Sequence, residues 1–219
     1  MEYLIESASS FAGRIDNVIL LVAVLTGFWL FLVEGVLFYF LFKYRRSNSP
    51  KSIYMTGEKK SETKLISWAH YLVLGCDVLV VYAAISVWYH VKQELPNPDA
   101  TIRVIGNQWA WIFVHPGKDG KIDTDDDIKS VDELHVMVDK TYHFKLESND
   151  VMHSFSVPVF RLKQDAIPGR VITGWFKPNK TGEHDIQCAE MCGIGHGIMA
   201  ARIFIKSEEE HRKWLDGKG

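Results

Sequence analysis

The amino-acid sequence predicts a two-helix transmembrane hairpin followed by an all-β domain. Two apolar stretches, residues 19–41 and 65–91, lie in the first hundred residues, and each is about long enough to cross a bilayer as a helix of roughly 20 residues. From about residue 100 the pattern changes to short alternating stretches separated by Pro and Gly, which is typical of a β-sandwich. We therefore expect a membrane hairpin over residues 1–95 and a β domain over residues 96–219.

The charges around the two spans predict how the hairpin is oriented. Loops rich in Lys and Arg stay in the cytoplasm, and before the first span the only cation is Arg14. The interhelical loop is therefore expected in the cytoplasm, with both termini and the β domain on the periplasmic side of the cell membrane. No typical signal peptide precedes the first span, so residue 1 is expected to be the true start. The cations between the spans are Lys43, Arg45, Arg46, Lys51, Lys59, Lys60 and Lys64.

Three ionisable residues, Glu34, His70 and Asp77, interrupt the apolar spans. Such groups either take part in proton movement or face a neighbouring subunit or water, and the sequence leaves these alternatives open. Cys76, in the middle of the second span, is best explained by packing.

The β domain is expected to contain strands over residues 101–114, 133–138, 141–147, 170–177 and 200–206. Trp109 and Trp111 alternate along the first of these and would share one face, so core packing is the simplest explanation for both. Ser207 and Glu210 form a capping-box pattern, which predicts a short final helix that includes Trp214.

Residues 188–199 combine two thiols, an imidazole and a thioether, contributed by Cys188, Cys192, His196 and Met199. This mixture of soft ligands favours copper, because zinc sites do not use thioethers. Two thiolates four residues apart could bridge two copper ions that share one electron, and His153 is the best candidate for a second imidazole. A disulfide between the two cysteines is the alternative, but it leaves both histidines and the methionine unexplained.

The run Cys-x-Glu-x-Cys-x-x-x-His-x-x-Met resembles the CuA signature of subunit II of haem-copper cytochrome c oxidases. The resemblance extends through Gln108 and Trp109 to Trp111, and through residues 151–155 and 161–170. It implies a cupredoxin-like Greek-key domain with a dinuclear copper centre. It also implies that cytochrome c delivers electrons to this centre, which passes them to haem in subunit I for reduction of oxygen to water coupled to proton translocation.

The same resemblance implies roles for individual residues. Trp109 would be the residue through which electrons enter. The carboxylate of Glu190 would bind magnesium shared with subunit I, and Asp165 and Arg170 would face the same subunit border. Glu62 matches a residue near a proton-uptake route only in part, because the residues that follow it differ from the family pattern. The implied copper ligands are His153, Cys188, the backbone carbonyl of Glu190, Cys192, His196 and Met199.

Several questions stay open at this point. The acidic residues between positions 119 and 127 could form a docking surface for a basic cytochrome c, a calcium loop or a solvated loop. The same copper subunit could serve a nitric oxide reductase, and a membrane-tethered copper protein without a catalytic partner is a further alternative. No Cys-x-x-Cys-His motif occurs, so no haem is expected on this chain, and no nucleic-acid partner is expected.

Overall fold

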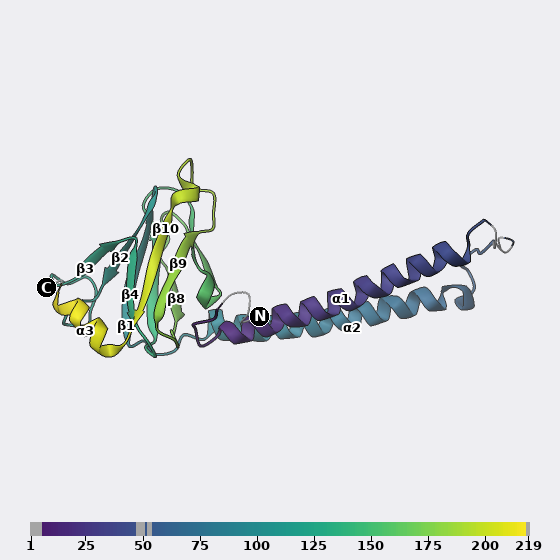
Figure 1. The fold of residues 1–219 in the computed structure, drawn as a ribbon, viewed down its shortest axis with the longest axis horizontal. Helices are drawn as coiled ribbons and strands as arrows, with labels where there is room; N and C mark the ends of the chain where they lie inside the picture. Colours follow the sequence, from purple (N-terminus) through teal and green to yellow (C-terminus); the bar gives the residue numbers. More distant parts are fainter. Residues whose placement is uncertain (1–5, 47–50, 52–53, 218–219) are drawn as a thin grey trace. The chain divides into compact units, whose positions relative to one another are not determined.

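The computed structural model describes residues 6–46, 51 and 54–217 (Figure 1). The chain forms two compact units. One unit is Asp16–Trp88, and the other combines the segment up to Ile15 with the chain from Tyr89 onward. The first unit contains the two long helices, and the second contains every strand assigned in the described residues.

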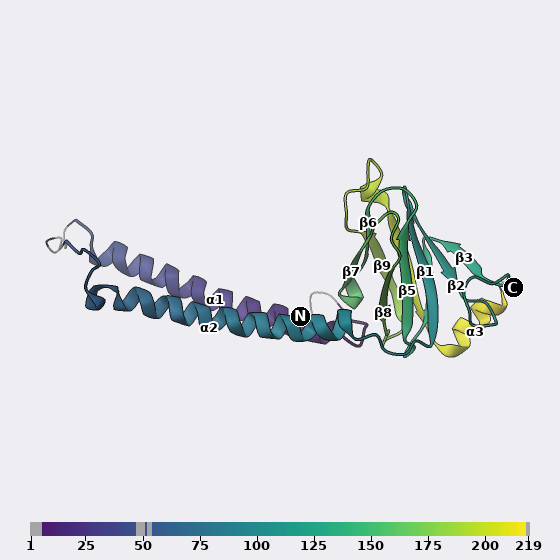
Figure 2. The same cartoon turned by 180° about the vertical axis from the view of Figure 1, so that it is seen from behind.

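The helical unit is a hairpin of α1 (Ala12–Lys43) and α2 (Lys60–Trp88), which lie side by side in both views (Figures 1 and 2). A short π-helical turn, Tyr89–Gln93, continues α2. Both helices are long and apolar enough to cross a membrane, and their apolar side chains are largely exposed. In water such exposure would be costly, whereas in lipid it is favourable. The predicted pair of apolar helices is confirmed.

The second unit is a sandwich of two five-stranded sheets. The first sheet has the order β3-β2-β1-β5-β8 and the second the order β4-β10-β9-β6-β7. The pairs β1 with β5 and β4 with β10 are parallel, and the other paired strands are antiparallel. The predicted cupredoxin-like Greek-key fold class is confirmed. The strands are β1 (Ala100–Asn107), β2 (Ala110–His115), β3 (Ile128–Val131), β4 (Glu133–Met137), β5 (Tyr142–Ser148), β6 (His153–Val157), β7 (Leu162–Ala166), β8 (Ile172–Phe176), β9 (Gly182–Cys188) and β10 (Ala200–Lys206).

Alternation along the strands places a cluster of aromatic rings between the sheets. Phe155 lies at its centre, with ring centroids 5.4 Å from Trp111, 6.3 Å from Phe113 and 5.9 Å from Phe144. All four side chains are fully buried, so each contributes its whole apolar surface to stability. Gly174 of β8 gives this cluster room, because a Cβ there would lie 2.3 Å from the tip of the Phe144 ring.

The N-terminal segment before the membrane helix packs into the β unit. Ala8 and Phe11 are fully buried, and Phe11 makes an edge-to-face contact with Trp175 at 5.3 Å. The backbone N–H of Ala8 donates to the carbonyl of Val159 at 2.9 Å, and the Ser9 hydroxyl donates to the carbonyl of Phe160 at 3.0 Å. The expected boundary at residue 95 assigns Ala8 and Phe11 to the membrane hairpin. The sequence does not separate the two environments, because a residue in a protein core and a residue facing lipid have the same apolar character.

The strand predicted over residues 101–114 is in fact two strands. The chain reverses at Gln108 and Trp109, which are joined by a cis peptide bond, and Asn107 pairs with Ala110 across the turn. Trp111 is fully buried, whereas Trp109 lies in the turn with 37% of its surface exposed. The prediction that the two tryptophans share one face is therefore wrong. Strands β3, β6, β7 and β9 were not predicted.

The final helix α3 (Glu208–Asp216) begins with the predicted capping box. The backbone N–H of Glu210 donates to the Ser207 hydroxyl at 3.4 Å, and the backbone N–H of Ser207 donates to the Glu210 carboxylate at 2.9 Å. Trp214 then stacks on His135 at a centroid distance of 4.4 Å, which fixes the helix against the second sheet.

Buried histidines beneath α3 should make the β unit sensitive to acid. Burial, with smaller effects of His135 and His211, lowers the pKa of His115 to about 3, and burial lowers the pKa of His135 to about 4. In the unfolded chain both pKa values return to about 6.5, so the unfolded state binds more protons below that pH. The free energy of unfolding is therefore expected to fall as pH decreases from about 6.5 toward 3–4.

The variant His115→Gln tests this dependence, because glutamine does not titrate but can still form a hydrogen bond with Ser130, as His115 does at 3.2 Å. The loss of unfolding free energy between about pH 7 and about pH 5 should be smaller in the variant by about 1–2 kcal/mol. Chemical denaturation of the full chain at both pH values measures it. Equal losses in wild type and variant would show that His115 titrates normally in the folded protein.

Candidate metal site

The predicted metal ligands lie at one end of the sandwich, on a loop and an adjacent strand. Cys188 is the last residue of β9, and the loop that follows contains a short 3-10 turn, His196–Ile198, before β10 begins. The backbone N–H of Cys188 donates to the carbonyl of Met199 at 3.1 Å, so the first and last side-chain ligands of the loop are held together by the main chain. His153 is the first residue of β6, which pairs with β9.

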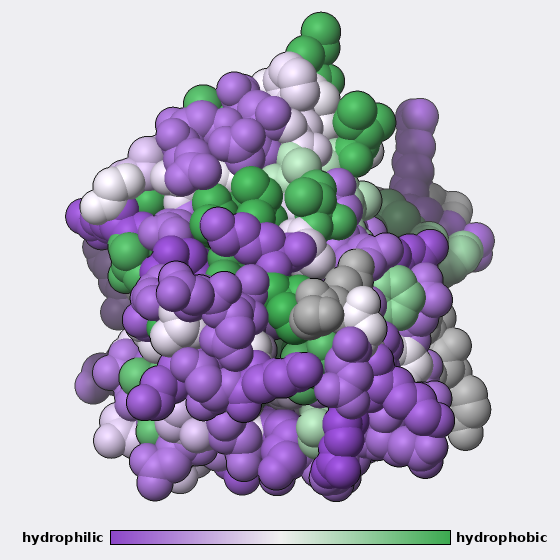
Figure 3. All heavy atoms as spheres, turned by 90° about the vertical axis from the view of Figure 1, so that its left-hand side faces the viewer, coloured by the Kyte–Doolittle hydropathy of each residue, from purple (hydrophilic) through white to green (hydrophobic). Residues whose placement is uncertain are grey.

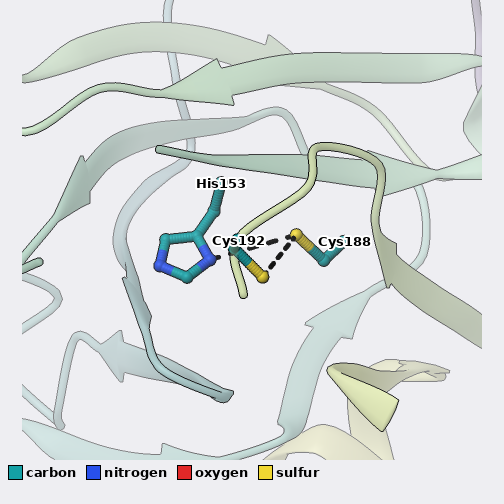
Figure 4. Close-up of side chains that lie close together, drawn as sticks. All are labelled: His153, Cys188 and Cys192. Atoms are coloured by element: carbon teal, nitrogen blue, oxygen red, sulfur yellow. Dashed lines mark hydrogen bonds between the residues drawn. The ribbon is translucent and has the colours of Figure 1, made fainter. Parts of the chain in front are cut away.

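The donor atoms of this loop and strand converge. The sulfurs of Cys188 and Cys192 are 3.7 Å apart, and the Nδ1 atom of His153 lies 3.9 Å from the Cys188 sulfur. Figure 4 shows these three side chains pointing toward one another, and their donor atoms all lie within 4.8 Å. The Cys192 sulfur is 3.7 Å from the His196 Nδ1 atom and 3.8 Å from the Met199 sulfur.

The backbone of Glu190 completes the set, since its carbonyl oxygen lies 3.2 Å from the Cys188 sulfur. The structure thus brings together all six residues that sequence reasoning selected as ligands. Two sulfurs occupy the centre, an imidazole lies beside each of them, and the thioether and the carbonyl oxygen lie at the two flanks. This arrangement offers donors on both sides of two neighbouring thiols.

The two cysteines are free thiols, at a sulfur separation too long for a disulfide bond. Cys188, Cys192, His153 and Met199 are each at least 92% buried. Burial, reinforced by the neighbouring Cys188, raises the pKa of Cys192 to about 11. Two buried thiolates therefore need a cation beside them, and a mixture of thiolate, thioether and imidazole donors fits copper. The donor set therefore fits a dinuclear copper centre.

Asp150 orients His153 and was not selected from the sequence. Its carboxylate accepts a hydrogen bond from the Nε2 atom of His153 at 2.8 Å, which leaves Nδ1 facing the cysteines without a proton. The same carboxylate accepts the backbone N–H of Gln108 at 2.6 Å and of Val151 at 2.6 Å. An Asp three residues before a candidate His ligand was the available signal.

Trp109 contacts the metal loop directly. Its indole N–H donates to the carbonyl of Cys192 at 3.2 Å, and the Gln108 side-chain amide donates to the same carbonyl at 2.8 Å. The indole ring packs closely against the backbone at Gly193 and Gly195. A Cβ at Gly195 would come within 2.4 Å of the ring, so only glycine permits this approach.

The other residues that the sequence analysis singled out are not among the six donors described above. Asp165 accepts a hydrogen bond from the hydroxyl of buried Ser154 at 2.7 Å, and Arg170 is exposed. In the helical unit, Glu62 accepts the backbone N–H of Gly57 at 3.0 Å, and the Nδ1 atom of His70 is 2.8 Å from the carbonyl of Ile66.

Asp77 lines a cavity of about 330 Å³ between the two membrane helices. The cavity walls include Thr26, Trp29 and Cys76. A role in proton movement stays a prediction for this residue, as it does for Glu62 and His70.

The acidic stretch lies at the opposite end of the sandwich from the metal loop. Strand β2 begins next to Trp109 and runs away from it for six residues, roughly 20 Å, before the acidic stretch follows. Lys118 at its start is 3.8 Å from Asp216 of α3. The position of these acidic residues therefore does not support a docking surface beside the metal loop.

The carboxylates of the acidic stretch are largely engaged by the protein itself. Asp126 accepts hydrogen bonds from the Thr124 hydroxyl at 2.8 Å and the Asp119 backbone at 3.2 Å, Asp127 accepts the Asp123 backbone N–H at 2.8 Å, and Asp123 pairs with Arg103. A solvated loop closed by its own hydrogen bonds accounts for these contacts without calcium.

Comparisons with known proteins agree with the geometry of the site. Residues 100–207 match the family described as cytochrome c oxidase subunit II, periplasmic domain. The chain is 30% identical over 226 residues to the alternative cytochrome c oxidase subunit 2 of Bradyrhizobium diazoefficiens, with 93% of this chain and 80% of that protein covered. It is 44% identical over 117 residues to cytochrome c oxidase subunit 2 of Thermostichus vulcanus, with 53% of this chain and 33% of that protein covered.

Among solved structures, the periplasmic domain of subunit II of cytochrome oxidase from Bradyrhizobium japonicum is similar, with a TM-score of 0.51 and 33% sequence identity. The match covers 57% of this chain and 96% of that domain. The fold, the convergent soft donors and the relatives all lead to one assignment: this chain belongs to the cytochrome c oxidase subunit II family.

Proposed function

We propose that this chain is the electron-input subunit of a haem-copper cytochrome c oxidase. It accepts electrons from cytochrome c at a dinuclear copper centre and passes them to haem in subunit I, where oxygen is reduced to water and protons are translocated. The observation that carries this proposal is the convergence of four further donors on two unpaired thiols whose sulfurs are 3.7 Å apart. The oxygen-reducing site lies on the other subunit, and this chain does no oxygen chemistry.

The copper pair, when bound, supplies a one-electron redox couple shared between two metal ions. Cys188 and Cys192 would hold it through their thiolates, and His153 and His196 through their imidazoles. Asp150 keeps the proton of His153 on Nε2, so that Nδ1 stays available to the metal. Met199 and the Glu190 carbonyl would supply two further donors, and the hydrogen bond from the Cys188 backbone N–H to the Met199 carbonyl closes the loop that carries them.

Trp109 is the residue through which electrons enter. Its ring is partly exposed on one side and, on the other, its N–H bonds to the carbonyl of the ligand Cys192. The contact provides a short route from the surface to the centre. The carboxylate of Glu190 binds magnesium shared with subunit I, which is consistent with the preference of magnesium for carboxylate oxygen atoms and for ligands shared with a partner.

The helical hairpin anchors the chain in the cell membrane with its interhelical loop in the cytoplasm and the copper domain in the periplasm. The support is the excess of cations between the spans, among them Lys43, Lys59 and Lys60. External protease applied to intact spheroplasts should cleave the β domain and spare the loop. Cleavage within the loop alone would reverse this orientation.

Electron paramagnetic resonance of the copper-loaded full chain in detergent tests the function. Hyperfine structure from two equivalent copper nuclei is expected, and the signal should disappear when reduced cytochrome c is added to the assembled oxidase. A single-copper pattern, or no bound copper, contradicts the proposal. An intact signal that cytochrome c cannot reduce would leave a copper centre without the proposed donor.

A further inference from the structure

Two methionines beside the metal site are exposed, whereas the sulfur ligands of the site are covered. Cys188, Cys192 and Met199 are 8%, 3% and 2% exposed. Met191 is 74% exposed and Met152 is 44% exposed. The sulfur atoms that an ion from solvent meets first therefore belong to Met152 and Met191, which are not among the six ligands. We call these two residues the thioether pair.

The backbone brings the thioether pair to the same end of the site. Strands β6 and β9 pair with Phe155 opposite Cys188, and a backbone hydrogen bond of 2.9 Å continues the contact one residue further on each segment. Met152 and Met191 each lie three residues beyond the Phe155–Cys188 pair, one on each segment. Each member of the thioether pair also directly precedes a residue of the metal site in the sequence.

Exposure alone does not assign a function to the thioether pair. In Figure 1 the yellow-green loop between β9 and β10 projects beyond the ends of the strands, and Figure 3 shows apolar side chains projecting at this end above a mostly hydrophilic face. Single exposed apolar residues are common on protein surfaces. What distinguishes the thioether pair is its chemistry, because thioethers are among the soft donors that select Cu(I).

The charges of the surrounding segments do not oppose the approach of a cation. Residues 106–111, 149–152 and 189–199 contain no Lys or Arg, and their carboxylates belong to Asp150 and Glu190. A copper ion that approaches the thioether pair therefore meets no positive side chain from these segments.

We propose that Met152 and Met191 form an entry site, which captures Cu(I) at the surface and passes it to the thiols of the metal site. The inference rests on the function proposed above. A thioether carries no proton, so it binds Cu(I) directly, whereas a thiol binds the metal as its thiolate. Neutral thioethers also attract the cation less strongly than thiolates do, so the transfer is directed inward.

The transfer is an exchange of ligands without a change of oxidation state. The bonds from Cu(I) to the thioethers break as bonds to the sulfurs of Cys188 and Cys192 form. The thiol protons leave to water. No oxidant or reductant takes part in this step.

The test follows copper uptake by the copper-free full chain in detergent, without oxygen, from Cu(I) held by a weakly binding coloured chelator. The double variant Met152→Leu/Met191→Leu keeps the approximate volume and the apolar character of both side chains and removes their sulfur atoms. Met55→Leu is the matched control, because Met55 is 57% exposed but belongs to the helical unit.

The double variant should take up copper about tenfold more slowly than wild type, measured as the loss of the coloured chelator complex. Its final copper content should equal that of wild type. After oxidation with ferricyanide it should also show the same two-copper hyperfine structure. The control should match wild type in rate, copper content and spectrum.

A second measurement detects the entry site without the finished centre. In the variant Cys188→Ser/Cys192→Ser the thiols that would withdraw the metal are absent, so Cu(I) should stay at the surface. With isotope-labelled methionine methyl groups, added Cu(I) should shift the nuclear magnetic resonance signals of Met152 and Met191. The signal of Met55 should stay in place.

Equal uptake rates in wild type and double variant would overturn the entry site while leaving the copper centre and the electron-input function intact. A shift of the Met55 signal as large as those of the thioether pair would show that Cu(I) binds any exposed methionine. An altered two-copper spectrum in the double variant would assign the pair to the finished centre instead. If the wild-type chain binds no copper, the proposed function fails together with the inference.

Discussion

Replacing Cys192 with serine is expected to abolish the two-copper signal and to slow electron transfer from cytochrome c by at least about 100-fold. The reason is geometric, because the Cys192 sulfur is the atom that lies near the Cys188 sulfur, the His196 imidazole and the Met199 thioether at once. A serine hydroxyl is a hard donor that does not bridge two copper ions as a thiolate does. Losing a residue that merely supports a metal ligand already costs about 10–100-fold.

Cys76→Ser is the matched control for this variant. Cys76 is the remaining cysteine of the chain and lies half-buried in α2, in the helical unit. Its replacement should leave the copper content, the hyperfine pattern and the rate unchanged. Two-copper hyperfine structure that survives in Cys192→Ser would show that Cys192 is not a bridging ligand.

The candidate metal loop could be predicted from the sequence because its four side-chain donors lie within twelve residues, so their proximity depends little on the rest of the fold. His153 came from its chemistry and from the resemblance, and the pairing of β6 with β9 places it beside Cys188. Asp150 was missed because its signal, a position three residues before a candidate His ligand, does not by itself show that the two side chains form a hydrogen bond.

Two parts of the fold escaped sequence reasoning for different physical reasons. The Trp109-Ala110-Trp111 alternation is the pattern of a continuous strand, and no proline marks the reversal at Gln108 and Trp109. Hydrophobic alternation reports which face a residue occupies, not where the backbone turns. Phe11 was assigned to the membrane part because it precedes an apolar helix, yet it is buried against Trp175 of β8.

The glycines around the site illustrate a constraint that appears only in three dimensions. A Cβ at Gly106 would lie 2.8 Å from the ring of His153, and one at Gly195 would lie 2.4 Å from the ring of Trp109. In the sequence both positions are ordinary glycines. Glycine lets the His153 ring lie directly against the backbone of β1 at Gly106 and lets the Trp109 ring lie directly against the backbone of the metal loop at Gly195.

Trp111→Ala is expected to destabilise the β unit strongly, by about 3–5 kcal/mol of unfolding free energy. Trp111 is fully buried, with its ring 5.4 Å from Phe155 and 6.0 Å from His153. Truncation removes the packing that links the aromatic core to His153, a proposed copper ligand. Denaturant midpoints of the copper-free full chain measure the loss without the contribution of bound metal.

Trp111→Phe separates packing from hydrogen bonding at the same position. In the part of the chain that the structure describes, the buried Nε1 atom of Trp111 has no hydrogen-bond partner. Phenylalanine keeps most of the ring contacts and removes an unsatisfied donor, so its cost should stay below about 1.5 kcal/mol. A Phe variant as unstable as the Ala variant would show that the indole N–H is satisfied in solution. A loss below about 1 kcal/mol for Trp111→Ala would instead show that the ring is not what joins the core of the sandwich to its metal site.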